Sequence, residues 1–92
     1  MYERILKSGV EVAKLDGTTS VTVKSVSKHA CVSRQTVHAH FTSAHSLRNA
    51  VFRECIRLQV LSVVAALIAT KHPIATEIPR NMRDAAIKSL SV

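Results

Sequence analysis

The feature that most constrains the fold is a pair of short helical segments, close together in the chain, between Thr22 and Leu47. In the first segment the apolar residues recur at the spacing of one helical face; they are Val23, Val26 and Ala30. Thr22 precedes them and can cap the helix with its hydroxyl. Residues 19–23 have strand-like propensity, but the sequence offers no second strand to pair with them. We therefore predict a short helix that ends in a break at residues 30–32.

A second short helix is predicted directly after this break. Ser33 can cap it, because its hydroxyl can accept a hydrogen bond from the amide of Gln35 or Thr36. Val37 and Phe41 lie four residues apart and are expected to point into the core. The side chains left on the outside are polar: Arg34, Gln35, Thr36, His38 and His40. Such a pair predicts a helix-turn-helix, whose second helix can enter the major groove of DNA.

Helices are predicted on both sides of this pair, which makes the fold class all-α. About residues 2–15 form an amphipathic helix with the stripe Ile5, Gly9, Val12 and Ala13. Gly9 is expected to mark a close approach of another helix, and Gly17 suits a left-handed helix end. The result is a three-helix DNA-binding head, followed by a long connecting helix and a short final helix.

The connecting helix is predicted to begin after Ser43, a third hydroxyl cap, and to continue unbroken to about Thr70. At about 27 residues it would be roughly 40 Å long. His72-Pro73 ends it, and Pro79 precedes the last helix at residues 80–90. The apolar stripe of that last helix is Met82, Ala86 and Leu90.

The second half of the connecting helix, Val60 to Ala69, is apolar on all sides. Two interpretations are open: an intramolecular core or an interface with a partner. We favour the interface, because a chain of 92 residues has little else to cover such a helix. The predicted homodimer contacts are Leu61, Val64, Leu67 and Ile68.

Charge indicates the class of partner. The net charge is +7 and the sequence pI is about 10.1. Between Asp16 and Glu54 there is no acidic residue, whereas basic residues and histidines are frequent; they are Lys24, Lys28, His29, Arg34, His38, His40, His45, Arg48 and Arg53. A surface of one sign favours a polyanion, and double-stranded DNA fits the helix pair. A membrane surface is less favoured, because the positive residues are dispersed.

This pattern resembles the N-terminal DNA-binding domain of TetR-type transcriptional regulators. The matching residues are Ile5-Leu6, Gly17, Thr22-Val23, Val26, Ala30-Cys31-Val32-Ser33, Thr36-Val37-His38, His40-Phe41, Ser43 and Leu47. The DNA-contacting positions that the resemblance implies are Thr22, Lys24, Ser33, Arg34, Gln35, Thr36, His38 and His40. We expect Lys24, Arg34, Gln35 and Thr36 to read bases, and the others to contact the phosphate backbone.

The chain departs from the family at three positions and in length. Cys31 stands where the turn usually has Gly, His38 where Tyr is usual, and Ala44 where a phosphate-binding Lys is usual. Nothing resembles a full inducer-binding domain, so we expect a truncated or miniature relative without a small-molecule inducer.

The predicted function is therefore that of a sequence-specific, double-stranded DNA-binding regulator, a homodimeric repressor located in the cytoplasm. Residues 1–48 would form the helix-turn-helix DNA-binding domain and residues 49–92 a helical dimerisation region. Two alternatives stay open: a DNA-recognition subunit of a larger assembly of the phage packaging type, and a helix-turn-helix module that binds protein.

Other chemistry is not expected. No His or Cys pair has zinc-site spacing, so no metal or other cofactor is predicted. No catalytic framework accompanies Cys31, Cys55 or the two aspartates, so the chain is not expected to be an enzyme. Both cysteines are expected to be reduced thiols. The longest apolar run is too short to span a bilayer.

Overall fold

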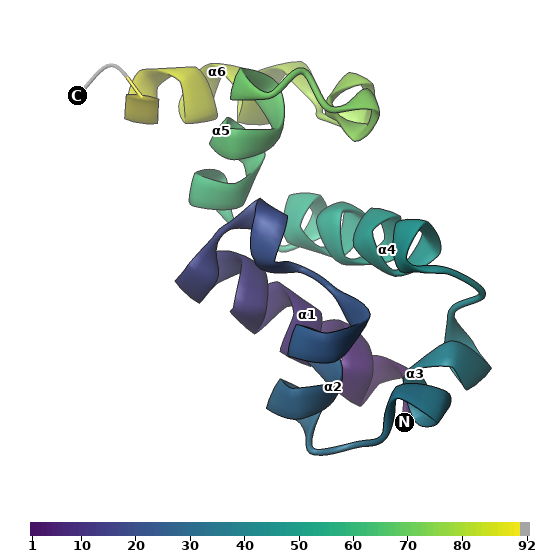
Figure 1. The fold of residues 1–92 in the computed structure, drawn as a ribbon. Coiled ribbons are helices and arrows are strands. Elements are labelled where there is room, and N and C mark those ends of the chain that lie inside the picture. The colour runs from purple at the N-terminus through teal and green to yellow at the C-terminus, as the bar shows by residue number, and fades with distance from the viewer. Residues whose placement is uncertain (91–92) are drawn as a thin grey trace.

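The computed structural model describes the backbone of residues 1–90 and the side chains of residues 1–88. Within these residues the chain forms helices and no strand, which confirms the all-α prediction (Figure 1). The elements in order are α1 (Tyr2–Asp16), the 3-10 turn η1 (Thr18–Ser20), α2 (Val23–Ala30), α3 (Arg34–His40), α4 (Ala44–Arg57), α5 (Leu61–Ala69), the 3-10 turn η2 (Pro73–Glu77) and α6 (Arg80–Leu90). We call residues 1–57 the head and residues 58–90 the tail.

The head is organised around α1, which packs against both α2 and α4. Its predicted stripe is buried, including Gly9. A Cβ placed on Gly9 would lie 2.4 Å from Cγ2 of Val51 on α4, well inside van der Waals contact. The predicted close helix approach at Gly9 is thus confirmed, and α4 is the helix that makes it.

The start of α1 also holds the end of α3. The rings of Tyr2 and Phe41 are stacked with centroids 5.1 Å apart, and Phe41 and Val37 are buried as predicted. Offset stacking of aromatic rings adds to the apolar burial. This contact holds Phe41, at the end of α3, against the start of α1.

The chain leaves α1 through Gly17, but not in the predicted left-handed helical conformation. Gly17 has φ 93° and ψ 167°, so its φ is positive while its ψ is extended. Glycine reaches this region at no steric cost because it lacks Cβ. The extended ψ directs the chain into η1 rather than folding it back over the end of α1.

The predicted long connecting helix is wrong, because α4 ends at Arg57 and a separate helix, α5, begins at Leu61. Between them Gln59 adopts φ 57°. Two hydrogen bonds close α4: the amide of Gln59 donates to the carbonyl of Ile56 at 3.1 Å, and the amide of Val60 donates to the carbonyl of Cys55 at 2.9 Å. This left-handed closing motif is usually formed with Gly. A Gln in its place gave no signal of a helix end in the sequence.

The same closing motif ends two other helices. After α2 it uses Cys31 at φ 58°, and after α5 it uses Lys71 at φ 54°. The amides of Cys31 and Val32 donate to the carbonyls of Lys28 and Ser27, and those of Lys71 and His72 donate to Ile68 and Leu67. Three of the helices therefore stop at a left-handed residue that is not glycine.

The tail packs against itself as well as against the head. Helix α6 packs across α5, and both lie at the end of the elongated molecule away from α2 and α3 (Figure 1). Val64 and Leu67 are 0% and 1% exposed within the single chain. Their predicted place at a dimer interface is therefore wrong, because α5 turns this face toward other parts of its own chain.

The other two predicted interface residues are still accessible: Leu61 is 36% exposed and Ile68 is half-buried. In α6, Met82 is half-buried and Ala86 is buried, as its stripe predicts. The side chain of Leu90 lies outside the described residues. The predicted domain boundary at residue 48 falls inside α4, whose later residues share one core with α1.

Candidate nucleic-acid interface

Helix α2 begins at a reciprocal cap between Thr22 and Ser25. The Thr22 hydroxyl oxygen accepts from the Ser25 amide at 3.1 Å, and the Ser25 hydroxyl oxygen accepts from the Thr22 amide at 3.0 Å. Two amides that a helix start leaves without partners are satisfied in this way. The predicted role of Thr22 as a cap is confirmed, and its hydroxyl is already engaged inside the head.

Helix α3 begins in a similar way at Ser33. Its hydroxyl oxygen accepts from the amide of Thr36 at 3.1 Å and lies 2.9 Å from the Thr36 hydroxyl. The predicted cap is confirmed, with Thr36 rather than Gln35 as the donor. Because the Thr36 side chain is half-buried and joined to the cap, it is less available to a partner than its neighbours on α3.

The turn between α2 and α3 carries the main departure from the TetR pattern. Cys31 has φ 58° and ψ 42°, the left-handed helical region, and its thiol is exposed. A residue with Cβ pays about 1–2 kcal/mol in this conformation. The turn therefore keeps the backbone path that glycine would take, at the cost of local strain.

The five predicted contact residues that take no part in a cap fall into two groups. Lys24 on α2 and Arg34, Gln35 and His38 on α3 are exposed, and none of the four has a hydrogen bond or ion pair from its side chain to the described residues. His40 is exposed but lies edge-on to the ring of Tyr2, with centroids 6.2 Å apart. The first group can turn freely toward a partner, whereas His40 is partly fixed against α1.

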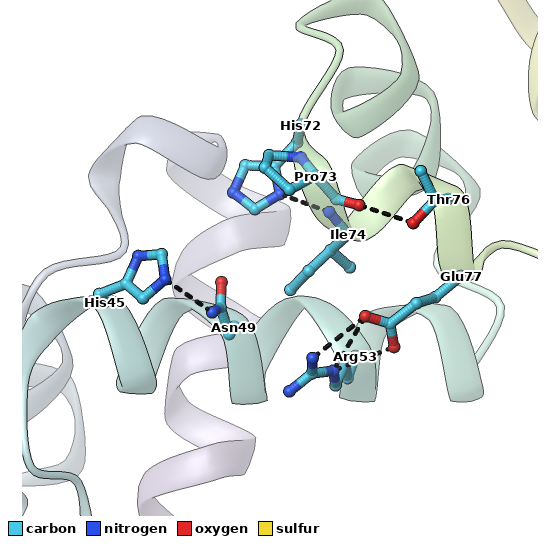
Figure 2. Close-up of polar contacts among 8 residues, drawn as sticks. All are labelled: His45, Asn49, Arg53, His72, Pro73, Ile74, Thr76 and Glu77. Atoms are coloured by element: carbon cyan, nitrogen blue, oxygen red, sulfur yellow. Dashed lines mark hydrogen bonds and ion pairs between the residues drawn. The ribbon is translucent and has the colours of Figure 1, made fainter.

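The start of α4 adds a third hydroxyl cap. The Ser43 hydroxyl oxygen accepts from the Ser46 amide at 3.1 Å, and the Thr42 and Ser46 hydroxyls lie 3.3 Å apart. In the next turn, Nε2 of His45 lies 3.1 Å from Nδ2 of Asn49 (Figure 2). The side chain of His45 is thus held within α4. It does not take the place of the phosphate-binding Lys that TetR-type regulators usually have at the position of Ala44.

The stretch between Asp16 and Glu54 contains no acidic residue, but an acid from elsewhere in the chain pairs with one of its cations. Arg53 forms a bidentate pair with Glu77 of η2, its Nε 3.0 Å from Oε1 and its Nη2 3.1 Å from Oε2 (Figure 2). This pairing raises the pKa of Arg53 and lowers that of Glu77, in each case chiefly through the hydrogen bonds between the two side chains. Arg53 therefore does not contribute a free positive charge.

The remaining basic residues of the stretch keep their charge unpaired. Within residues 1–88 the ion pairs are Lys14 with Glu11, Arg57 with Glu54, and Arg53 with Glu77. Three of the acids, Glu3, Glu11 and Glu54, line a groove of about 440 Å³ between α1 and the end of α4. The cations of α2 and α3 have no carboxylate paired with them.

Neither cysteine nor histidine forms a metal centre in this part of the chain. No group of three or more His, Cys, Asp or Glu side chains among the described residues could hold a metal ion. Cys31 and Cys55 are both free thiols, and burial raises the pKa of the Cys55 thiol to about 12. Among the helices described, none is both long and apolar enough to cross a membrane.

Comparisons with protein-family models, with curated protein sequences and with solved structures each found no match to this chain. The resemblance to TetR-type regulators therefore rests on the residues quoted for it.

Proposed function

We propose that this chain binds double-stranded DNA through α3, with α2 and the turn at Cys31 positioning that helix. The proposal rests on four side chains of α2 and α3 that are exposed and have no partner among the described residues: Lys24, Arg34, Gln35 and His38. Arginine suits guanine and glutamine suits adenine in the major groove, so Arg34 and Gln35 are the base-reading candidates.

We further propose that the protein acts as a homodimeric, TetR-type transcriptional regulator, a repressor, located in the cytoplasm. A dimer engages two half-sites about one helical turn apart, which multiplies weak single contacts. Because Val64 and Leu67 are buried, the surface available for pairing centres on Leu61 and on Leu58, which are 36% and 50% exposed at the α4–α5 junction.

The salt dependence of DNA binding tests this function. If a dimer neutralises about six phosphates, its affinity for a duplex falls about a thousandfold between 50 and 200 mM salt. Fluorescence anisotropy with a labelled duplex measures the slope of log affinity against log salt. A matched pair sharpens the result: Lys28→Gln on α2 lowers the slope if Lys28 meets a phosphate, whereas Arg83→Gln on α6, with the same charge change, leaves it unaltered.

A flat salt response, or no binding at low salt, would exclude the DNA function and favour the protein-interaction alternative. Native mass spectrometry on the same sample distinguishes a dimer from the larger ring expected of an assembly subunit.

A further inference from the structure

A second concave site lies where the head meets the tail. A cavity of about 450 Å³ is lined by η1, by the middle of α4, and by the segment that joins α5 to η2. It shares no lining residue with the groove between α1 and α4, and none with the exposed group on α2 and α3. It is therefore a separate site that DNA binding does not explain.

Three basic side chains line this cavity, together with the hydroxyls of three threonines. Arg48 and Lys71 contribute cationic side chains, and neither has an ion pair or a side-chain hydrogen bond within the described residues. The third basic residue, His72, accepts a hydrogen bond at Nδ1 from the amide of Ile74 at 3.1 Å (Figure 2). Because a ring nitrogen that accepts carries no proton, the His72 proton is on Nε2, which is free to donate.

No acid lines the cavity to neutralise these groups. Glu77 reaches α4 from the neighbouring turn η2, but both of its carboxylate oxygens are held by Arg53 (Figure 2). Arg48 is half-buried, and no carboxylate is paired with its guanidinium within the described residues. A cation in that position is stabilised by an anion from outside the chain.

Lys71 and His72 have a structural explanation that does not extend to Arg48. Lys71 follows the end of α5, where a positive side chain interacts favourably with the last carbonyl groups. The ring of His72 caps η2 by accepting from the amide of Ile74. Arg48 comes from α4 and lies before the middle of that helix, so no helix end accounts for it. Among the basic residues of the lining, Arg48 is therefore the one whose position a ligand explains.

The floor of the cavity is apolar. Phe52 and Leu67 are 2% and 1% exposed, and the Phe52 ring lies edge-on to His72 with centroids 5.1 Å apart. Pro73 adds a further apolar surface to the lining. A ligand that fits both parts has an anionic head and a compact apolar body.

We propose that this cavity binds a small organic carboxylate, with its head on Arg48 and Lys71 and its apolar body on the exposed ring of Pro73. The planar guanidinium of Arg48 matches a carboxylate in a two-point contact, and Nε2 of His72 supplies a further donor. The occupied site joins η1 of the head to the end of α5 in the tail. This goes beyond the proposed DNA binding and revises the expectation that the chain takes no small molecule.

The test uses the full chain without DNA, so its outcome is independent of the DNA function. The protein is titrated with benzoate and, separately, with the neutral isostere benzamide, while amide shifts are followed by ¹H–¹⁵N NMR. We expect saturable shifts with benzoate centred on Thr18, Arg48 and Lys71, and at least tenfold weaker binding of benzamide. Equal binding of the two probes, no saturation, or shifts spread over the cations of α2 and α3 would overturn the proposal.

Matched variants locate the head group of the ligand. Arg48→Gln is expected to weaken benzoate binding at least tenfold, whereas Arg83→Gln, which removes the same charge on α6, leaves it unchanged. Arg48→Lys keeps the positive charge but loses the planar guanidinium, so its affinity for benzoate is expected to lie between those of Arg48→Gln and the unchanged protein. If Arg48→Gln unfolds, Lys71→Gln replaces it, and unchanged binding in a folded variant of either residue contradicts the assignment.

Discussion

The helices of the head and of the tail begin for different physical reasons. In the head, α2, α3 and α4 each begin at a hydroxyl residue, Thr22, Ser33 and Ser43, that accepts from an amide one turn later. In the tail, α5 begins after Val60 with no side-chain cap. Left-handed residues end helices in both regions, at Cys31 in the head and at Gln59 and Lys71 beside α5. The difference is in how the helices start: α2, α3 and α4 start at side-chain caps, and α5 does not.

The two regions also differ in what they expose. Helices α2 and α3 present unpaired cations and no acid, while α5 carries no charged residue and buries Val64 and Leu67. Short capped helices can hold polar residues outward because their stability rests on caps and on a few buried positions such as Val37. An apolar helix such as α5 is stable only where it is covered. The head is therefore suited to a polar partner, and the tail to structural support.

The sharpest test of this contrast is a charge at the centre of α5. Val64→Glu places a carboxylate at a site that is 0% exposed and has no partner for it. Leaving an unpaired charge in a core costs about 3–5 kcal/mol, a large part of the stability of a small domain. We expect loss of helicity and of the cooperative thermal transition, measured by circular dichroism.

Leu61→Glu is the matched control, because Leu61 is on the same helix but 36% exposed. It should keep its helicity and, if the proposed dimer uses this surface, sediment as a monomer. A Val64→Glu protein that stays fully helical and only loses its dimer would restore the interface interpretation of Val64.

The next largest effect concerns the head. Arg34→Ala and Gln35→Ala are each expected to cost about 1–3 kcal/mol of binding free energy per half-site and to relax specificity at one base position. Arg83→Ala in the tail should change neither. Anisotropy with a selected binding sequence and with single-base variants of it separates the two effects, and a uniform loss across all sequences would move base reading away from α3.

The sequence predicted the head well because its signals are local. Thr22, Ser33 and Ser43 could be recognised as caps from residue type and from the apolar residues that follow them. The burial of Val37 and Phe41 followed from four-residue spacing. These signals could not predict the hydrogen bond between the Thr36 and Ser33 hydroxyls. Nor could they predict the ring contact between Tyr2 and His40, because these residues are far apart in the chain.

The tail was predicted less well because its boundaries depend on tertiary contacts. Gln59 ends α4 in a conformation normally marked by Gly, so residue type alone indicates continuation there. The end of α5 at Ala69 was predicted, because His72-Pro73 marks it in the sequence. The apolar run of α5 has the same composition whether a second copy or its own chain covers it. The pairing of Arg53 with Glu77 and the convergence of Arg48 with Lys71 join separate segments, and no spacing rule contains them.

A smaller effect tests the left-handed helix end that separates head from tail. Gln59→Gly removes the Cβ that is strained at φ 57°, so we expect the free energy of unfolding to rise by up to about 1 kcal/mol. Ala85→Gly, in the exposed interior of α6, should instead lower it by about 1 kcal/mol. Urea unfolding measures both, and a loss of stability in Gln59→Gly would mean that the turn is held by contacts of the Gln59 side chain.

The smallest effect comes from the ion pair that ties η2 to α4 across the two regions. The pKa of Glu77 lies below its ordinary value of 4.5 because Arg53 donates to its carboxylate. A lowered pKa in the folded state means that the pair stabilises the fold above the ordinary value, and that this contribution is lost as pH falls through the folded value. Both side chains are about half exposed, so the change is small. Glu77→Gln should therefore lower stability slightly at pH 7 and flatten its decline below about pH 4.5, as measured by urea unfolding across the acid range.

Arg53→Gln should flatten this decline equally, and the double variant should add nothing further, since either single change already removes the pair. Additive effects of the two changes would mean that Arg53 and Glu77 act separately, and that η2 is held to α4 by the burial of Ile74 and Ala75 alone.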